Sequence, residues 1–311
     1  MKIDFMTKPI VVWFGALICC ALWGSAFPCI KIGYRMMNIA GDDTASQILY
    51  AGYRFTLAGI MAIVIGSLIN RKFLYPSKQA VKKVCVLSMF QTILQYLFFY
   101  IGLAHTNGTK ASIITGMNVF VAIIVSSLLF RLEDLTTKKI IGCIVGFLGV
   151  IFVNISSGGI DMNFAFNGEG FIFLSTVSYA FSSVTLKKYS KTENTVMLSG
   201  WQFLVGGIVM SIAGLMMGGH LEGFNASAVL MLIYLAFISS VAYSLWSILL
   251  TYNPVSRVAV FGFMNPIIGF LLSAILLDEA GTIGIFTLIA LILVCAGIYI
   301  VNLGNKTENE T

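Results

Sequence analysis

Charge is scarce in this sequence. Of its 311 residues only 10% are Asp, Glu, Lys or Arg, whereas 58% are hydrophobic and the mean hydropathy is +0.93. Soluble domains carry roughly 25% charged residues, and a chain of this length could not cover a water-facing surface with so few charges. The composition therefore excludes a soluble protein and predicts an integral membrane protein that is mostly embedded.

Groups that hold metals, cofactors or nucleotides are also scarce. The histidines are His105 and His220, and no pair of residues has metal-ligand spacing. The sequence has no GxxxxGK[ST] motif for nucleotide phosphates. All cysteines lie in apolar stretches, where they behave as small hydrophobic residues; they are Cys19, Cys20, Cys29, Cys85, Cys143 and Cys295. We therefore expect no metal, no cofactor and no disulfide framework.

Long apolar runs dominate the sequence. A helix that crosses a bilayer needs about 20 mostly apolar residues, and ten such stretches can be read. They are Ile10–Gly33, Ser46–Ile69, Val84–Ala104, Thr109–Phe130, Ile140–Ile155, Gly168–Leu186, Val196–Met217, Ala226–Leu250, Val255–Leu277 and Ile283–Leu303. The predicted fold class is an all-α polytopic membrane protein with ten transmembrane helices and no soluble domain.

Positive charge is concentrated on one side of these spans. If the N-terminus is cytoplasmic, the cytoplasmic segments hold most of the 19 basic residues: Lys2, Lys8, Arg71, Lys72, Lys78, Lys82, Lys83, Arg131, Lys138, Lys139, Lys187, Lys188, Lys191, Arg257 and Lys306. Cytoplasmic loops of membrane proteins are rich in Lys and Arg. This bias predicts a multi-pass protein of the cell membrane with both termini in the cytoplasm. The net charge of +6 is then explained by cytoplasmic loops that face anionic membrane lipid, and we expect no nucleic-acid partner.

The two halves of the chain resemble each other. At an offset of 148 residues, Gly52, Phe55, Gly59, Ile60 and Gly66 match Gly200, Phe203, Gly207, Ile208 and Gly214. The spacing of seven places each set of glycines on one helix face, which favours close helix packing. Because each half has five expected spans, the second half must be inverted. We predict two inverted five-helix repeats, residues 1–155 and 156–311, an arrangement typical of alternating-access transporters.

Arg54 is the charged residue expected deepest in the membrane. It lies eight residues into its span, roughly 12 Å from the end. Its guanidinium is a possible fork for a substrate carboxylate, or it ties helix ends together, and both interpretations stay open. No acidic residue falls in the middle of a span. For Glu133 and Glu279, at span ends, we expect interface roles beside a helix end or a nearby lysine.

Other polar and aromatic residues could line a path between the repeats. Asn118 and Asn265 each follow a flanking cation by eight residues and reach similar depth from opposite sides. Several aromatic residues are equally compatible with ordinary packing. The candidate substrate-binding residues are Arg54, Asn118, Asn265, Trp23, Gln95, Tyr96, Tyr179, Gln202, Tyr243 and Trp246.

Four stretches resemble the EamA-type members of the drug/metabolite transporter superfamily. They are WGSAFPCIK at 23–31, YRF at 53–55, LEDLTTKKIIGCIVGFLGVIFVN at 132–154 and YNPVSRVAVFGFMNPIIGFLLSAILLDE at 252–279. The resemblance covers nearly the whole chain and implies five-plus-five spans and export or exchange of small metabolites, often amino acids. One departure is Val119, which stands where the second repeat has Pro266 and where the family often has proline.

These observations favour a secondary transporter that exports or exchanges a small-molecule substrate by alternating access. Amino acids or related compounds are the expected cargo, carried by a monomer or homodimer. The alternative is a polytopic membrane enzyme, such as an acyl or glycosyl transferase. Such an enzyme would need clustered acids or histidines at an interface, which the sequence does not show. A channel would need a ring of charge or a filter-like loop.

Overall fold

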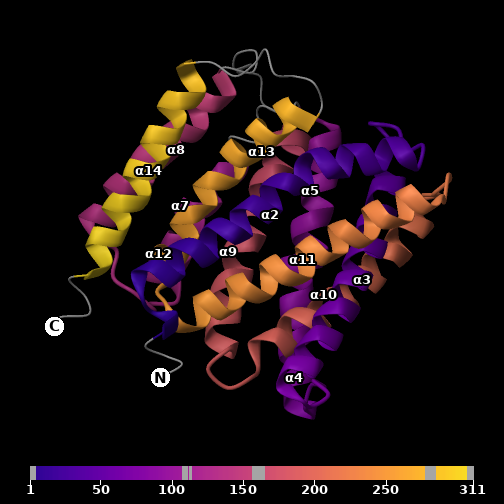
Figure 1. Cartoon of the computed structure of the whole chain (residues 1–311), viewed down its shortest axis with the longest axis horizontal. Coiled ribbons are helices and arrows are strands. Elements are labelled where there is room, and N and C mark those ends of the chain that lie inside the picture. The colour runs from indigo at the N-terminus through magenta and orange to yellow at the C-terminus, as the bar shows by residue number, and fades with distance from the viewer. Residues whose placement is uncertain (1–4, 107–110, 112–113, 156–164, 277–284, 307–311) are drawn as a thin grey trace.

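The described part of the chain is all-helical. A computed structural model describes residues 5–106, 111, 114–155, 165–276 and 285–306, and these residues form no strand. The α-helices are α2 (Pro9–Met36), α3 (Thr44–Asn70), α4 (Lys78–Leu87), α5 (Gln95–Ala104), α7 (Asn118–Ile124), α8 (Thr137–Ile155), α9 (Phe171–Tyr189), α10 (Thr195–Met216), α11 (Ala226–Tyr252), α12 (Val255–Ala259), α13 (Met264–Leu276) and α14 (Ile285–Lys306). Figure 1 shows their arrangement as one bundle.

Five helices of the described residues are long and apolar enough to cross a membrane. They are Pro9–Met36, Thr44–Asn70, Lys78–Leu103, Thr195–Met216 and Ala226–Tyr252. Large apolar side chains cover the outside of the bundle: Leu68, Ile69 and Met216 are 73%, 76% and 84% exposed. Such a surface suits lipid rather than water. The chain is therefore a multi-pass membrane protein.

Polar residues in the connecting segments start several helices. The side chains of Asp43, Ser77, Asn194 and Asn225 each accept a hydrogen bond from a backbone N–H of the helix that follows. This satisfies one of the donors that a helix N-terminus leaves unpaired. Burial favours a raised pKa for Asp43, but hydrogen bonds from the hydroxyl and backbone of Ser46 outweigh burial and lower that pKa.

Among the described residues, four of the expected spans contain a segment that is not regular α-helix; one of these segments is the π-helical η3 (Phe166–Gly170), which precedes α9. A π-helical segment, η1 (Ser88–Leu94), joins α4 to α5, and another, η2 (Val125–Leu129), continues α7. A 3-10 segment, η4 (Val260–Phe263), separates α12 from α13. It lies where Pro266 lacks an N–H and crowds the carbonyl of Gly262 four residues earlier. Val119 is the second residue of α7 and follows a turn at Met117, whose N–H bonds the carbonyl oxygen of Ile114 three residues earlier. The first-half span is therefore also interrupted at the matching position, although it lacks the proline.

The matched glycines bring α3 and α10 into backbone contact. A Cβ atom placed on Gly52 would lie 2.5 Å from the backbone nitrogen of Ser211, and one on Gly207 would lie 2.3 Å from that of Thr56. Contacts step forwards along α3 as they step backwards along α10, so the helices are antiparallel: Gly52–Ser211, Thr56–Gly207, Gly59–Leu204 and Ile63–Gly200. The predicted close packing of the glycine faces is confirmed.

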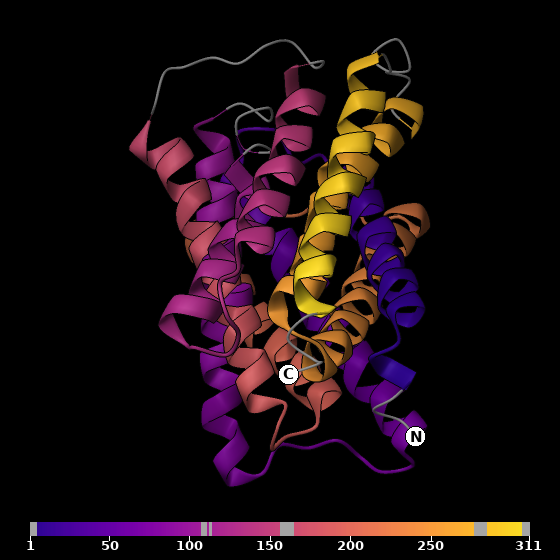
Figure 2. The same ribbon diagram turned by 90° about the vertical axis from the view of Figure 1, so that its left-hand side faces the viewer.

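A second antiparallel pair is formed by α8 and α14. A Cβ atom on Gly149 would lie 2.7 Å from Val294 Cγ2, and one on Gly297 would lie 2.6 Å from the backbone nitrogen of Gly146. Figure 2 shows these two helices side by side along one flank of the bundle. The helices α2, α9 and α11 pack between this pair and the α3–α10 pair (Figure 1).

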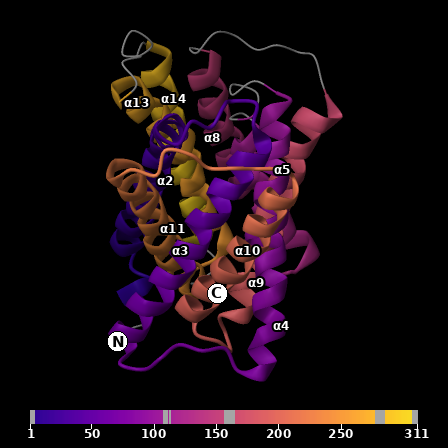
Figure 3. The same ribbon diagram turned by 90° about the vertical axis from the view of Figure 1, so that its right-hand side faces the viewer.

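Basic residues gather at one end of the bundle. There α2 begins and α14 ends, and α4 and α10 also begin, as Figures 1 and 3 show. Arg71 follows α3 at this end, and Lys78, Lys82 and Lys83 lie in the first turns of α4. We call it the basic end.

Candidate functional site

Arg54 lies deep inside the bundle. It occupies the middle of α3 and is 3% exposed. Its Nε donates hydrogen bonds to the carbonyl oxygen of Leu235 at 3.3 Å and to Oγ of Ser239 at 3.0 Å, both on α11. These bonds fix the guanidinium between α3 and α11.

No carboxylate balances the charge of Arg54 among the described residues. The ion pairs found there with Lys83 and Lys139 as cations use Glu193 and Glu133, and Arg54 takes part in neither. Its terminal nitrogens make no hydrogen bond to a described residue. An uncompensated charge at this depth is costly, so the site favours an anion beside these nitrogens.

Aromatic side chains from several helices meet next to Arg54. The ring of Trp23 on α2 lies 4.9 Å from that of Tyr243 and 5.0 Å from that of Trp246, both on α11. The hydroxyls of Tyr96 and Tyr243 lie 2.9 Å apart. Tyr179 on α9 lies beside Trp246, and Gln95 on α5 lies beside Tyr243. We call these six residues the aromatic cluster.

The guanidinium and the aromatic cluster form one region. Five tyrosines lie close enough to Arg54 to interact with its charge: Tyr34, Tyr50, Tyr96, Tyr100 and Tyr243. The ring of Phe55 lies 4.4 Å from that of Tyr96, and the ring of Phe203 lies 4.8 Å from that of Tyr243. Seven of the ten predicted site residues are thus joined by contacts.

Several buried polar atoms of this region have no hydrogen-bond partner among the described residues. The donors are Nε1 of Trp23 and of Trp246, and the acceptor is Oε1 of Gln95; the hydroxyls of Tyr34 and Tyr50 can act as either. Leaving such an atom unpaired costs about 1–3 kcal/mol. A polar molecule with a planar or apolar body would satisfy these atoms and pack against the rings.

Gln202, which matches Arg54 in the second half, is fully buried on α10. Its Oε1 accepts a 2.6 Å hydrogen bond from the hydroxyl of Thr92 in η1, and its backbone oxygen accepts one from Ser88. Its Nε2 has no described partner. The contacts of Gln202 are therefore with the π-helical segment rather than with the aromatic cluster.

Asn118 and Asn265 lie at the first turns of α7 and α13. The Oδ1 atoms of both are buried and lack a partner among the described residues. A Cβ on Gly262, just before α13, would lie 3.4 Å from Val119, so the two spans approach each other near these amides. No described contact joins either asparagine to the aromatic cluster.

The amino-acid sequence matches the model of the EamA-like transporter family over residues 10–155 and 166–303. The chain belongs to the EamA-like transporter family. It is therefore a transporter rather than an enzyme.

Relatives in this family span nearly the same length. An uncharacterized transporter of Archaeoglobus fulgidus is 27% identical over 93% of this chain and 98% of its own. A probable amino-acid metabolite efflux pump of Salmonella typhimurium is 26% identical over 92% and 93% of the two chains. One solved crystal structure, 15% identical, has a TM-score of 0.75 over 95% of this chain and 98% of its own, and shares the fold.

Some residues of the transporter's central region were not predicted. Tyr34 and Tyr50 have rings 5.4 Å apart and unpaired hydroxyls, and Ser239 bonds Arg54. Tyr50 precedes Arg54 by four residues on the same helix, so helical spacing could have indicated it. Ser239 had no such signal, because it reaches Arg54 from a helix 185 positions away.

Glu133 joins the segment that follows η2 to the first turn of α12. Its carboxylate accepts hydrogen bonds from Ser126 Oγ at 2.7 Å and from the backbone nitrogen of Ser256 at 3.1 Å. The hydroxyl of Ser256 also donates to it, and Lys139 Nζ lies 3.2 Å away. Glu133 thus has both expected kinds of partner, a helix end and a lysine. Glu279 lies outside the described residues.

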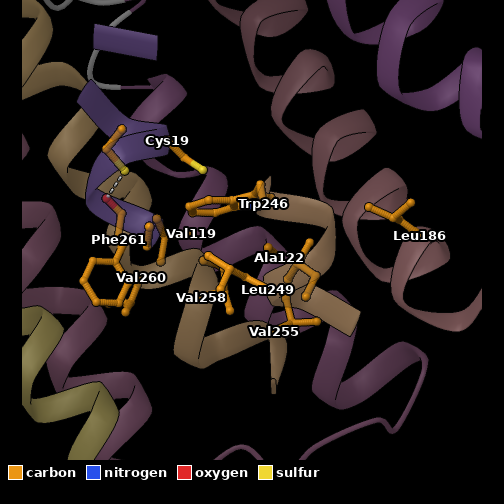
Figure 4. Close-up of a cluster of buried hydrophobic side chains, with 14 of the residues drawn as sticks. Cys19, Val119, Ala122, Leu186, Trp246, Leu249, Val255, Val258, Val260 and Phe261 are labelled. Atoms are coloured by element: carbon orange, nitrogen blue, oxygen red, sulfur yellow. Dashed lines mark hydrogen bonds between the residues drawn. The ribbon is translucent and has the colours of Figure 1, made fainter. Parts of the chain in front are cut away.

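An apolar layer lies beside Trp246 of the aromatic cluster. Figure 4 shows Val119 and Ala122 of α7 gathered with Leu249 of α11 and Val255 and Val258 of α12, below Trp246. All of these side chains are almost fully buried within one hydrophobic cluster. Trp246 of the aromatic cluster thus packs on one side against buried apolar residues that include two from α12.

Proposed function

We propose that this transporter moves small carboxylate-bearing metabolites, amino acids or related compounds, across the cell membrane by alternating access. The observation that carries the proposal is Arg54, a buried guanidinium with no described carboxylate partner beside aromatic rings and unpaired polar atoms. Arg forks recognise carboxylates. The name of the Salmonella relative, a probable amino-acid metabolite efflux pump, agrees with export of such compounds.

The proposed architecture is ten spans in two inverted repeats, residues 1–155 and 156–311. The helix contacts support it. Adding 148 to Gly52 gives Gly200, and subtracting 148 from Ser211 gives Ile63, which is the residue that Gly200 contacts. The same exchange relates Gly149–Val294 to Gly297–Gly146. A two-fold axis in the membrane plane produces this pattern, with the binding region between the repeats.

The proposed orientation puts the basic end in the cytoplasm. Lys and Arg favour the cytoplasmic side, and α2 begins and α14 ends there (Figure 1). The energy source is a solute gradient or exchange, since the sequence has no nucleotide-binding loop.

The test compares acids with amides. The purified protein is placed in liposomes, and uptake of radiolabelled amino acids and of their amides is measured for wild type, Arg54→Gln and Arg54→Lys. We expect Arg54→Gln to weaken the apparent affinity for acids by about tenfold or more, because a charge-assisted pair is lost, and to affect amides much less. Arg54→Lys keeps the charge but loses the fork.

Lys31→Gln is the matched control, since it removes one cation from an exposed position on α2. Equal loss for acids and amides in Arg54→Gln, or loss of folded protein, would show that Arg54 serves only to join α3 to α11.

A further inference from the structure

We propose that Glu133 is the positioning residue that holds the cytoplasmic side of this transporter closed. The inference rests on the proposed alternating access and adds a named residue that controls it. Glu133 lies between η2 and α8, in the first half of the chain, and its main partner across the bundle is Ser256 of α12, in the second half.

Glu133 is a buried charge that accepts hydrogen bonds from both halves of the chain. Its side chain is 3% exposed and that of Lys139 is fully buried. Ser126 and Lys139 bind the carboxylate from its own half of the chain. The backbone N–H and the hydroxyl of Ser256 bind it from the other half. Separating α12 from η2 and α8 therefore breaks two charge-assisted hydrogen bonds at once.

The position of Ser256 makes this contact a gate. It lies in the first turn of α12, directly after the corner between α11 and α12. The neighbouring Val255 and Val258 belong to the buried apolar layer beside Trp246 of the aromatic cluster (Figure 4). A path from the basic end to the cluster needs α12 to move away from α7, and α12 cannot move while Ser256 stays on Glu133.

Other polar contacts hold the same corner, but from the second half or without charge. Lys187 Nζ donates to the carbonyl oxygens of Leu250 and Asn253, and Asn253 Nδ2 donates to the carbonyl oxygen of Met6 at 3.1 Å. Lys187 also interacts electrostatically with the carboxylate of Glu133. Glu133 is thus the carboxylate at which the two halves meet in this corner.

Native cysteines allow the test without an added reporter. Cys20 is fully buried and its Sγ donates to the carbonyl oxygen of Phe261, in the segment that follows α12. Cys85 is exposed on α4. Inside-out vesicles are treated with a membrane-permeant maleimide, and labelling of Cys20 relative to Cys85 is followed in time by peptide mass spectrometry.

We expect Glu133→Gln to raise the rate of Cys20 labelling about three- to tenfold, the ratio expected when charge-assisted hydrogen bonds become neutral ones. Glu133→Asp keeps the charge and should recover part of the wild-type rate. Ser256→Ala leaves the ion pair in place and should give a smaller increase.

The matched control is Glu193→Gln, which removes the carboxylate of the partly exposed Lys83–Glu193 pair. It lies at the same end but does not touch α12, so Cys20 labelling should stay at the wild-type rate. Wild-type labelling in folded Glu133→Gln contradicts the proposal. If that variant does not fold, Glu133→Gln with Lys139→Met removes both charges, and Ser256→Ala tests the contact alone; wild-type labelling in either then overturns it.

Labelling needs no substrate, so the outcome is independent of what is transported. The gate can fail this test while Arg54→Gln still shows carboxylate selectivity. The substrate class can equally fail while Cys20 reports the gate.

Discussion

At the scale of single residues, Arg54 divides its donors between two tasks. Its Nε joins α3 to α11 through Leu235 and Ser239, while its terminal nitrogens make no hydrogen bond to a described residue. The two interpretations drawn from the sequence, a helix tie and a substrate fork, are therefore compatible in one side chain. Fixing Nε also restricts the rotamers of the side chain, so less entropy is lost when an anion binds.

The paired asparagines give a prediction at the same scale. We expect Asn118→Leu and Asn265→Leu each to reduce transport about tenfold or more while insertion and folding are kept, because leucine of similar size removes an unpaired buried amide oxygen that substrate or water would use. Uptake into liposomes and size-exclusion profiles are the measurements. Asn70→Leu is the control, since its amide bonds Gly66 of its own helix. Wild-type uptake in both variants would place the substrate path elsewhere.

Residue type and depth were enough to select most of the central region from the sequence. Trp23, Tyr96, Tyr243 and Trp246 were candidates because each places a large amphipathic ring in an apolar span, and the structure brings them together. Their partners could not be predicted. The bond from Ser256 to Glu133 joins residues 123 positions apart, and only packed helices define it.

At the scale of helices, the glycine faces determine how α3 and α10 pack. We expect Gly207→Ala to destabilise the protein by about 1–3 kcal/mol, the usual cost of overpacking, because the added Cβ would lie 2.3 Å from the backbone nitrogen of Thr56. The midpoint of thermal unfolding in detergent should fall. Gly41→Ala is the control, since nothing lies within 4 Å of its Cβ. An unchanged midpoint for Gly207→Ala would mean that the helices separate at no cost.

Helix existence was predictable from apolar length, but helix regularity was not. The span expected at Val84–Ala104 contains the π-helical segment η1. The hydropathy of the sequence does not distinguish a π-helical hydrogen-bond pattern from an α-helical one. The side chains of Ser88 and Thr92, in this segment, donate hydrogen bonds to Gln202. By contrast, Pro266 gave a visible sequence signal for the 3-10 segment η4 before it.

At the scale of the whole molecule, the basic end predicts an orientation that labelling can test. A cysteine in place of Lys78 should react with an impermeant maleimide only in inside-out vesicles, and one in place of Glu222, in the exposed segment between α10 and α11, only in intact cells. The positive-inside bias is the physical reason. Reaction of both positions from the same side would contradict the ten-span topology.

The backbone contact between α3 and α10 has a consequence for how this protein can move. Where glycines bring two backbones together, few side chains lie between them, so little rotamer entropy is released when the helices shift and little repacking is available to compensate. We expect such a helix pair to move as one rigid unit. Conformational change should then concentrate in the irregular helical segments of the bundle, the π-helical η1 and η2 and the 3-10 segment η4. Amide hydrogen exchange would show this as slow exchange along α3 and α10 and faster exchange in η1, η2 and η4.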